Sequence, residues 1–183
     1  MNELGNKIVV TFNKEMLEDY TNHYFRANPR KKKAPLEWCG KKRNGQLVSW
    51  NRLINCPNRI MQNQWKQEFA DYTTYVLQKQ GIKPMMLDKC VILVQQYQAT
   101  RTKSDSDNIC CKPVLDAMVK YELLAEDNYN IVNPVTLLTD YDKDNPRTEF
   151  IIYPIDEHHT YEDVIQTVSK DILKNKIFSK IIK

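Results

Sequence analysis

The sequence is poor in glycine and has no long apolar run, and both absences narrow the possible classes of protein. Only 4 of its 183 residues are glycine, so glycine-rich loops that bind phosphates are scarce. No run of 18 apolar residues is present, so we expect no transmembrane helix and no membrane partner. The first ten residues lack the charged-then-apolar layout of a secretory signal peptide, which predicts an intracellular protein.

The 5 cysteines form neither a disulfide framework nor a zinc-binding pattern. Their number is odd, and they include no C-x-x-C pair and no matching histidine spacing. This usage is typical of a reducing, cytoplasmic compartment. We expect the adjacent Cys110 and Cys111 to pack as small hydrophobic side chains and not to bind metal.

The positive charge of the chain is concentrated in one segment. The overall net charge is +4, but residues 26–43 contain eight basic residues and one acidic residue, so the remainder is net negative. Such a local excess suits a polyanion such as nucleic acid, and a solvated basic loop without a partner is the alternative. The candidate nucleic-acid contacts in this segment are Arg30, Lys31, Lys32, Lys33, Lys41, Lys42 and Arg43. Trp38 and Trp50 lie in the same irregular stretch, and we expect their rings to pin it to the core.

Hydrophobic patterning predicts strands and helices in alternation. The apolar stripe of residues 57–80 has helical spacing, and residues 89–97 are apolar on both faces, as in a central strand. Further strands are predicted at 7–12, 135–140 and 148–153, and further helices at 109–124 and from 161 onward, with a weakly periodic candidate at 15–25.

The order of these elements predicts one α+β domain. It is a two-layer sandwich with a mixed sheet, in the order β-α-β-α-β-β plus a C-terminal helix. The basic segment, about residues 26–56, is interpreted as an inserted loop, and about 160–183 as a helical extension. The acidic stretch 140–144 resembles the start of an EF-hand, but Asn145 and Ile151 replace the required Gly and Glu. We interpret it as a hairpin turn between the last two strands.

Two closely spaced aspartates follow the predicted central strand. Asp105 and Asp107 are separated by one residue, so in an extended or turn segment their carboxylates point the same way. Two such carboxylates repel unless a proton or cation lies between them, and Mg²⁺ binds a few carboxylates. Asp127, with Glu126 beside it, is an available third carboxylate. A simple helix N-cap at Asp107 or Asn108 is the competing interpretation.

These residues and their surroundings resemble the RusA family of Holliday-junction resolvases. The matching residues are Asp105, Asp107, Asn108, Lys112, Pro113, Asp116, Ala117 and Asp127. The resemblance covers about residues 7–12 and 57–155. It implies that Asp105, Asp107 and Asp127 bind Mg²⁺, with Mn²⁺ as a substitute. It also implies a catalytic Lys112 near the scissile phosphate and supporting roles for Asn108, Asp116 and Glu126. Asp116, four residues after Lys112, is placed to hold that lysine.

The resemblance implies a crossover junction endodeoxyribonuclease without an organic cofactor. Paired symmetric nicks in a four-way DNA junction imply a homodimer. Arg101 and Lys103, beside the carboxylates, are further candidate phosphate contacts. Three alternatives stay open: a nuclease acting on flap or fork DNA, a non-catalytic junction- or DNA-binding protein, and a protein-interaction domain. Phage or viral origin is one interpretation of so divergent a version.

The sequence departs from the family pattern at Lys112. The family lysine usually follows the second aspartate by four residues, but here Cys111 has that place and Lys112 is fifth. Five residues of a regular helix rotate by about 500°, which turns the lysine about 140° from the starting face. A later helix start, or a π-bulge near Cys110 and Cys111, would absorb the extra residue. Pro113 favours the later start.

Overall fold

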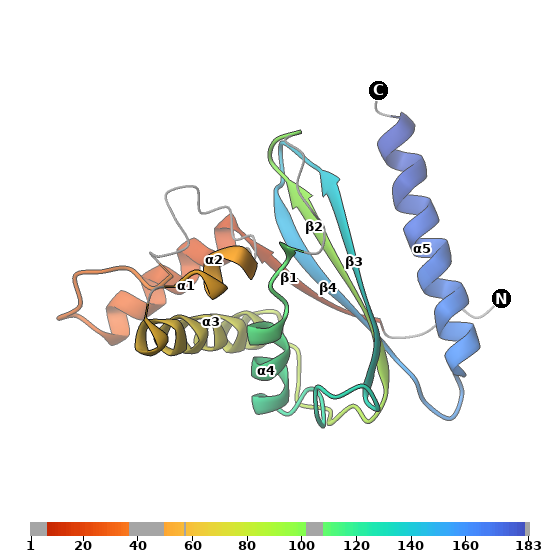
Figure 1. Cartoon of the computed structure of the whole chain (residues 1–183), viewed down its shortest axis with the longest axis horizontal. Coiled ribbons are helices and arrows are strands. Elements are labelled where there is room, and N and C mark those ends of the chain that lie inside the picture. The colour runs from red at the N-terminus through yellow and green to blue at the C-terminus, as the bar shows by residue number, and fades with distance from the viewer. Residues whose placement is uncertain (1–6, 37–49, 57, 102–107, 182–183) are drawn as a thin grey trace.

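The computed structural model describes residues 7–36, 50–56, 58–101 and 108–181 of the chain. The elements run in the order β1 (Ile8–Asn13), α1 (Lys14–Ala27), α2 (Trp50–Ile54), α3 (Arg59–Lys79), β2 (Cys90–Gln98), α4 (Lys112–Lys120), β3 (Val132–Tyr141), β4 (Arg147–Pro154) and α5 (Tyr161–Ile181). This confirms the predicted α+β class with a mixed sheet. Helices α1 to α4 lie on one side of the sheet, and α5 lies on the other (Figure 1).

The four strands form one sheet in the order β1-β4-β2-β3. Strand β2 is parallel to β3 and antiparallel to β4, and β1 pairs with β4 in antiparallel register. The first seven residues of β2 are buried because both faces of the strand are covered. Ile92 and Val94 pack into the core beneath α3 and α4, while Val91 and Leu93 pack beneath α5. The central position predicted for this strand is therefore confirmed.

The predicted hairpin between the last two strands is wrong. Strands β3 and β4 both pair with β2, which lies between them, so the connecting turn crosses the end of β2. Asp142 shapes this turn by accepting hydrogen bonds from the backbone N–H groups of Asp144 at 3.2 Å and Asn145 at 3.0 Å. A strand that is apolar on both faces gains most from a central place, and β2 takes that place between β3 and β4, so these two strands do not pair directly.

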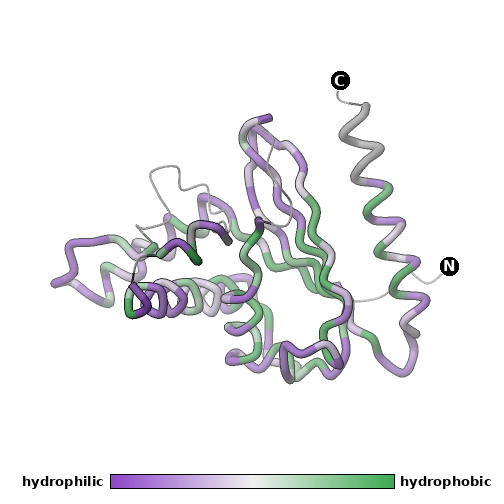
Figure 2. Tube along the Cα trace, in the orientation of Figure 1, coloured by the Kyte–Doolittle hydropathy of each residue, from purple (hydrophilic) through white to green (hydrophobic). Residues whose placement is uncertain are grey.

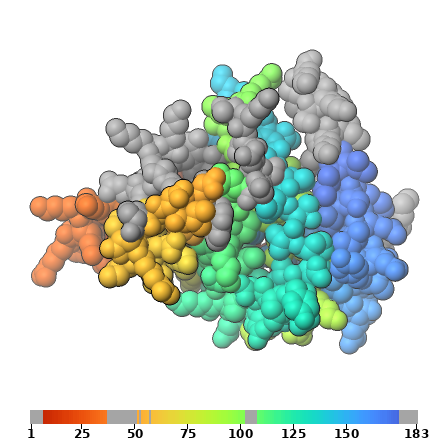
Figure 3. Space-filling model, in the orientation of Figure 1, coloured from red at the N-terminus to blue at the C-terminus, as the bar shows by residue number. Residues whose placement is uncertain are grey.

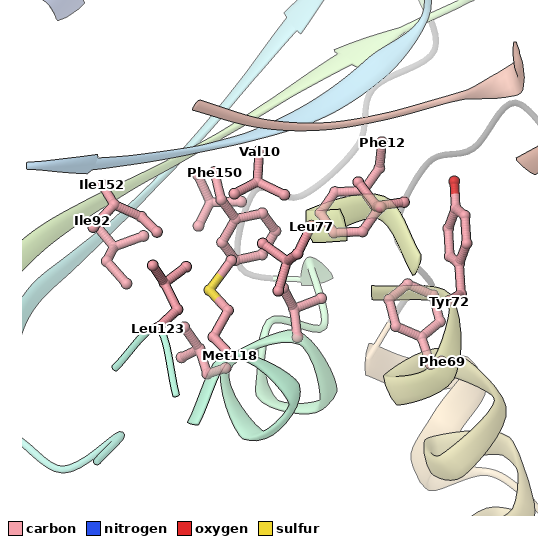
Figure 4. Packing of buried hydrophobic residues seen from close by; sticks show 14 of the residues in the cluster. Val10, Phe12, Phe69, Tyr72, Leu77, Ile92, Met118, Leu123, Phe150 and Ile152 are labelled. Carbon is pink, nitrogen blue, oxygen red and sulfur yellow. The ribbon is translucent and has the colours of Figure 1, made fainter. Parts of the chain in front are cut away.

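The main core lies between the sheet and helices α1, α3 and α4. Phe12 of β1 is fully buried, and its ring centroid lies 5.6 Å from that of Tyr72 and 5.8 Å from that of Phe150. Figure 4 shows Phe150 close to Met118 and Leu123, which come from α4 and the turn after it, and Phe12 further along toward Tyr72. Figure 2 shows apolar residues concentrated in the strands, whereas the loop after α1 is hydrophilic. The core thus fixes α3 and α4 against the sheet.

Helix α5 covers the second face of the sheet and forms a smaller core there. Val164 and Val168 are buried against Val91 and Leu93 of β2. Asp171 fastens the helix further, because it accepts a hydrogen bond from the Tyr153 hydroxyl at 2.9 Å. The predicted C-terminal helix is confirmed. None of the helices in the described part of the chain has the length and apolar character needed to cross a membrane.

Candidate functional site

Helix α4 begins at Lys112, three residues later than its sequence pattern predicts. Cys111 is the N-cap residue, and Pro113 lies in the first turn. Proline fits there because its ring fixes a helical φ and because first-turn N–H groups have no intrahelical partner. The later start is confirmed, because Lys112 is the first residue of the helix. The helix also ends earlier than predicted, at Lys120.

The side chain of Lys112 lies between two carboxylates. Its Nζ donates a hydrogen bond to Asp116 Oδ1 at 2.6 Å and a shorter one to Asp127 Oδ2. Asp116 is one helical turn further along α4, as the sequence spacing predicts, and Asp127 comes from the turn that follows the helix. The side chains of Lys112, Asp116 and Asp127 are 56%, 48% and 30% exposed. Three of the predicted site residues therefore meet at a place that solvent reaches.

The protonation states of this cluster follow from its hydrogen bonds. The bond to Asp116, reinforced by the bond to Asp127, raises the pKa of Lys112 above its ordinary value. The bond from Lys112 lowers the pKa of Asp127, against a smaller opposing effect of burial. Lys112 is therefore a cation and Asp127 an anion at neutral pH. With the carboxylate of Asp116 the cluster carries a net negative charge, which favours an added cation.

Asn108, four residues before the start of α4, is hydrogen-bonded to helix α2. Its Oδ1 accepts a hydrogen bond from the backbone N–H of Asn51 at 3.1 Å. Helix α2 is absent from the sequence prediction, which treats residues 26–56 as irregular. Five residues are too few for hydrophobic periodicity to reveal a helix, and Leu53, 2% exposed, marks its buried side.

The other predicted site residues fall into four groups. Glu126 is exposed, and its carboxylate accepts a hydrogen bond from the side-chain amide of Asn128. Arg101 is exposed, with its Cζ 5.0 Å from the ring centroid of Tyr141 at the end of β3. Arg30, Lys31, Lys32 and Lys33 are exposed on the loop after α1, well away from α4 (Figure 1). Outside the described residues lie Asp105, Asp107, Lys103, Lys41, Lys42, Arg43 and Trp38.

Of the three carboxylates predicted to bind Mg²⁺, Asp127 is the one that lies within the described residues. Its carboxylate is partly exposed and offers the oxygen ligands that Mg²⁺ prefers, so its chemistry fits the role implied. Across residues 7–36, 50–56, 58–101 and 108–181, no group of three or more His, Cys, Asp or Glu side chains is arranged to hold a metal ion. The other two predicted ligands, Asp105 and Asp107, belong to the segment that precedes Asn108.

Lys66 of α3 is a cation near the site that sequence reasoning missed. Gln62, one turn earlier on α3, donates a hydrogen bond to the backbone carbonyl of Leu53 in α2 at 2.9 Å. Burial raises the pKa of Cys110 to about 11, and the ammonium of Lys66 opposes this rise, so Lys66 lies within electrostatic range of Cys110. Cys110 itself is 3% exposed, which confirms its predicted hydrophobic role.

Comparison with protein-family models and with curated protein sequences gives no significant match to this chain. The fold and the cluster define an α+β protein with a solvent-exposed lysine between two aspartates. The RusA-like interpretation therefore rests on the motif residues and on the order of the elements around them.

Proposed function

We propose that this chain is a Mg²⁺-dependent endodeoxyribonuclease that resolves four-way DNA junctions by paired symmetric nicks. The observation that carries the proposal is the position of Lys112, at the first residue of α4 and within hydrogen-bonding distance of Asp116 and Asp127. A lysine turned by about 140° from the family's face of the helix would point away from Asp127. Because the helix begins only at Lys112, this rotation does not apply to the lysine, and its bond to Asp127 supports the proposal.

The residues of the cluster have distinct roles in the proposed reaction. Lys112 places a positive charge against the scissile phosphate, where negative charge increases in the transition state. Asp116 positions Lys112, and Asp127 completes with Asp105 and Asp107 the carboxylate set that would hold the metal. When bound, Mg²⁺ supplies Lewis-acid stabilisation of the reacting phosphate and a water of lowered pKa. Addition of water across the P–O3′ bond leaves a 5′-phosphate and a 3′-hydroxyl.

The distribution of basic residues supports a nucleic-acid substrate. Arg30, Lys31, Lys32 and Lys33 are exposed with no acidic residue among them. Side chains of this kind contact backbone phosphates and displace counterions, so binding should weaken steeply as salt increases. Two symmetric nicks require two copies of the site, and a C₂ homodimer supplies them.

The proposal is tested with a labelled four-way junction and a linear duplex of matched sequence, each with Mg²⁺ or EDTA. We expect paired nicks in the junction alone, only with Mg²⁺, and lost in Asp107→Asn and Lys112→Ala. Lys120→Ala is the matched control, because Lys120 is an exposed lysine at the other end of α4. Junction binding without cleavage would replace the proposal with a non-catalytic binding protein. Equal cleavage of flap or fork DNA would replace the junction specificity.

A further inference from the structure

The two edges of the sheet differ in how their outward backbone groups are satisfied. Strand β1 forms one edge and β3 the other. At β1 the side-chain amide of Gln80 accepts a hydrogen bond from the Thr11 N–H at 3.1 Å and donates one to the Thr11 carbonyl at 2.7 Å. The amide therefore pairs with β1 as the peptide group of a further strand would. This side chain closes the β1 edge against pairing with another chain.

Strand β3 has no such closure along its middle. Beyond its last residue, the N–H of Asp142 donates to the carbonyl of Gln98 at 2.9 Å and so points toward β2. Backbone groups alternate in direction along a strand, so those of Val135, Leu137 and Thr139 point away from β2. Within the part of the chain that the structure describes, no backbone group pairs with these three residues. The β3 edge is open there.

The open edge has defined ends and carries no charge. It begins after Pro134, which has no N–H, and it ends at Tyr141, whose N–H donates to Asp140 Oδ1 at 2.7 Å. Residues 135–139 between these ends read VTLLT, which is uncharged and rich in β-branched side chains. Figure 3 shows β3 at the surface between α4 and α5. An exposed edge without charge or proline is a template for a further strand.

We propose that residues 135–139 pair antiparallel with the same residues of a second copy of this chain, about a two-fold axis at Leu137. The pairing is self-complementary: Leu137 exchanges two hydrogen bonds with its counterpart, and Val135 exchanges two with Thr139 of the other copy. Because both β3 edges are used and both β1 edges are closed, assembly ends at a dimer. The inference rests on the proposed function for its choice of partner, since paired symmetric nicks need two copies of the site.

This pairing places both Lys112 clusters on one side of the joined sheet. The two-fold axis between antiparallel strands is perpendicular to the sheet, so equivalent faces of the two copies lie on the same side. Helix α4, which begins at Lys112, packs on the face that carries Ile92 and Val94 of β2. A four-way junction on that side can therefore contact both clusters at once. The open edge thus supplies the symmetry that two matched nicks require.

Val135 and Val9 offer a matched pair of substitutions. Each side chain is 38% exposed, and each residue lies on an edge strand, Val135 on β3 and Val9 on β1. Val9 is two residues before Thr11, so its backbone groups also point outward. Val135→Lys places a charge on the proposed contact, and edge lysines oppose strand pairing. Val9→Lys makes the same chemical change on the closed edge.

The first measurement is sedimentation equilibrium of the protein without DNA. We expect a wild-type dimer and a dissociation constant that Val135→Lys raises by about tenfold or more. Val9→Lys should leave the dissociation constant unchanged, and both variants should keep the wild-type melting temperature. A wild-type protein that stays monomeric would overturn the inference. A dimer that Val135→Lys leaves intact would overturn it equally.

The second measurement is amide hydrogen exchange of the wild type at concentrations above and below the dissociation constant. The Leu137 N–H should exchange about tenfold more slowly in the dimer, because it gains a hydrogen bond there. The Leu138 N–H, which points toward β2, should be protected at both concentrations. Val135→Lys should abolish the concentration dependence. Exchange of Leu137 that is equal in monomer and dimer would place the contact elsewhere and overturn the inference.

These measurements separate the interface from the proposed nuclease activity, because neither uses DNA. In the junction assay, Val135→Lys should lose paired nicks about tenfold at concentrations where it is monomeric, whereas Val9→Lys should keep them. A dimer with a protected Leu137 N–H that never cleaves would overturn the nuclease proposal alone. Paired nicks from a dimer that contacts through another surface would overturn the interface alone.

Discussion

Lys112 and Arg147 each lie between two carboxylates, but the two clusters differ in burial and geometry. Arg147 pairs with Asp142 at 2.8 Å and with Glu149 at 2.6 Å, and its Cζ lies 3.7 Å from the ring centroid of Tyr97. Its side chain is 17% exposed, whereas that of Lys112 is 56% exposed and hydrogen-bonds Asp116 and Asp127. The same combination of charges is therefore embedded in one place and accessible in the other.

The difference indicates what each cation does. The planar guanidinium of Arg147 stacks on Tyr97 while it bridges the turn that crosses the end of β2, so it stabilises the fold. Burial raises the pKa of Tyr97 to about 12, which keeps this ring neutral beneath the guanidinium. Lys112 is a point charge on a flexible stem and can exchange a carboxylate for a phosphate. We therefore expect loss of Lys112 to affect chemistry and loss of Arg147 to affect stability.

The largest effect should follow from Lys112→Ala. Cleavage of a four-way junction should fall by about 10²-fold or more, as when a charge-stabilising group is removed from a transition state. The free energy of unfolding should change by less than about 1 kcal/mol, because exposed ion pairs contribute little. Single-turnover cleavage and urea denaturation measure the two quantities. Near-normal cleavage by this variant would contradict the assignment of Lys112 to chemistry and of Arg147 to stability.

The next effect is the stability loss in Arg147→Ala. Removing one partner of a largely buried ion cluster leaves Asp142 and Glu149 without their cation, and we expect a loss of about 2 to 3 kcal/mol. Urea denaturation of both alanine variants under one condition tests the comparison directly. Equal losses for Arg147→Ala and Lys112→Ala would show that burial does not distinguish the clusters.

The two conservative substitutions Arg147→Lys and Lys112→Arg test whether the type of cation matters at each cluster. Arg147→Lys keeps the charge but loses the stacked plane and the two-pronged pairing, so we expect a loss of about 1 kcal/mol. Lys112→Arg should leave the free energy of unfolding nearly unchanged, because Lys112 makes no such stack within the described structure. Thermal and urea unfolding of the two variants measure these changes. An equal loss of unfolding free energy in Lys112→Arg would contradict the prediction.

The smallest effect concerns pH. Hydrogen bonding from Lys112 lowers the pKa of Asp127, so the unfolded chain binds its proton at a higher pH than the folded protein does. The stabilisation from Asp127 is complete above the ordinary aspartate pKa of about 4 and is lost as the pH falls through the lower folded value. Asp127→Asn should therefore be less stable than wild type at pH 6, by less than about 1 kcal/mol, and the difference should shrink as the pH falls below about 4. A difference that grows on acidification would contradict this sign.

Elements of the fold were predictable from the sequence where the hydrophobic pattern was long. The double-sided apolar run of β2 and the helical stripe of α3 each determine an element within two residues of its observed bounds. The order of the strands did not follow, because the turn at 142–146 has the composition of a hairpin although β2 separates β3 from β4. Turn chemistry reports a change of chain direction and not which strand becomes the neighbour.

The candidate site was predictable where side chains meet along a helix and not where the backbone takes part. The contact between Lys112 and Asp116 follows from i, i+4 spacing. The contact with Asp127 depends on how the chain returns after α4, which only the family order indicated. The bond from Asn51 to Asn108 uses a backbone N–H, which every residue except proline carries, so it leaves no trace in the sequence.

The sheet order has a consequence for folding during synthesis on the ribosome. Strand β1 hydrogen-bonds only to β4 within the described sheet, in a register that joins Ile8 to Ile152. A nascent chain therefore carries β1 without its sheet partner until more than a hundred further residues, up to and including β4, have been made. Contacts between such distant parts of a chain form slowly, and a waiting strand edge invites association with other chains. The synthesis of residues 147–154 is the event that closes this interval.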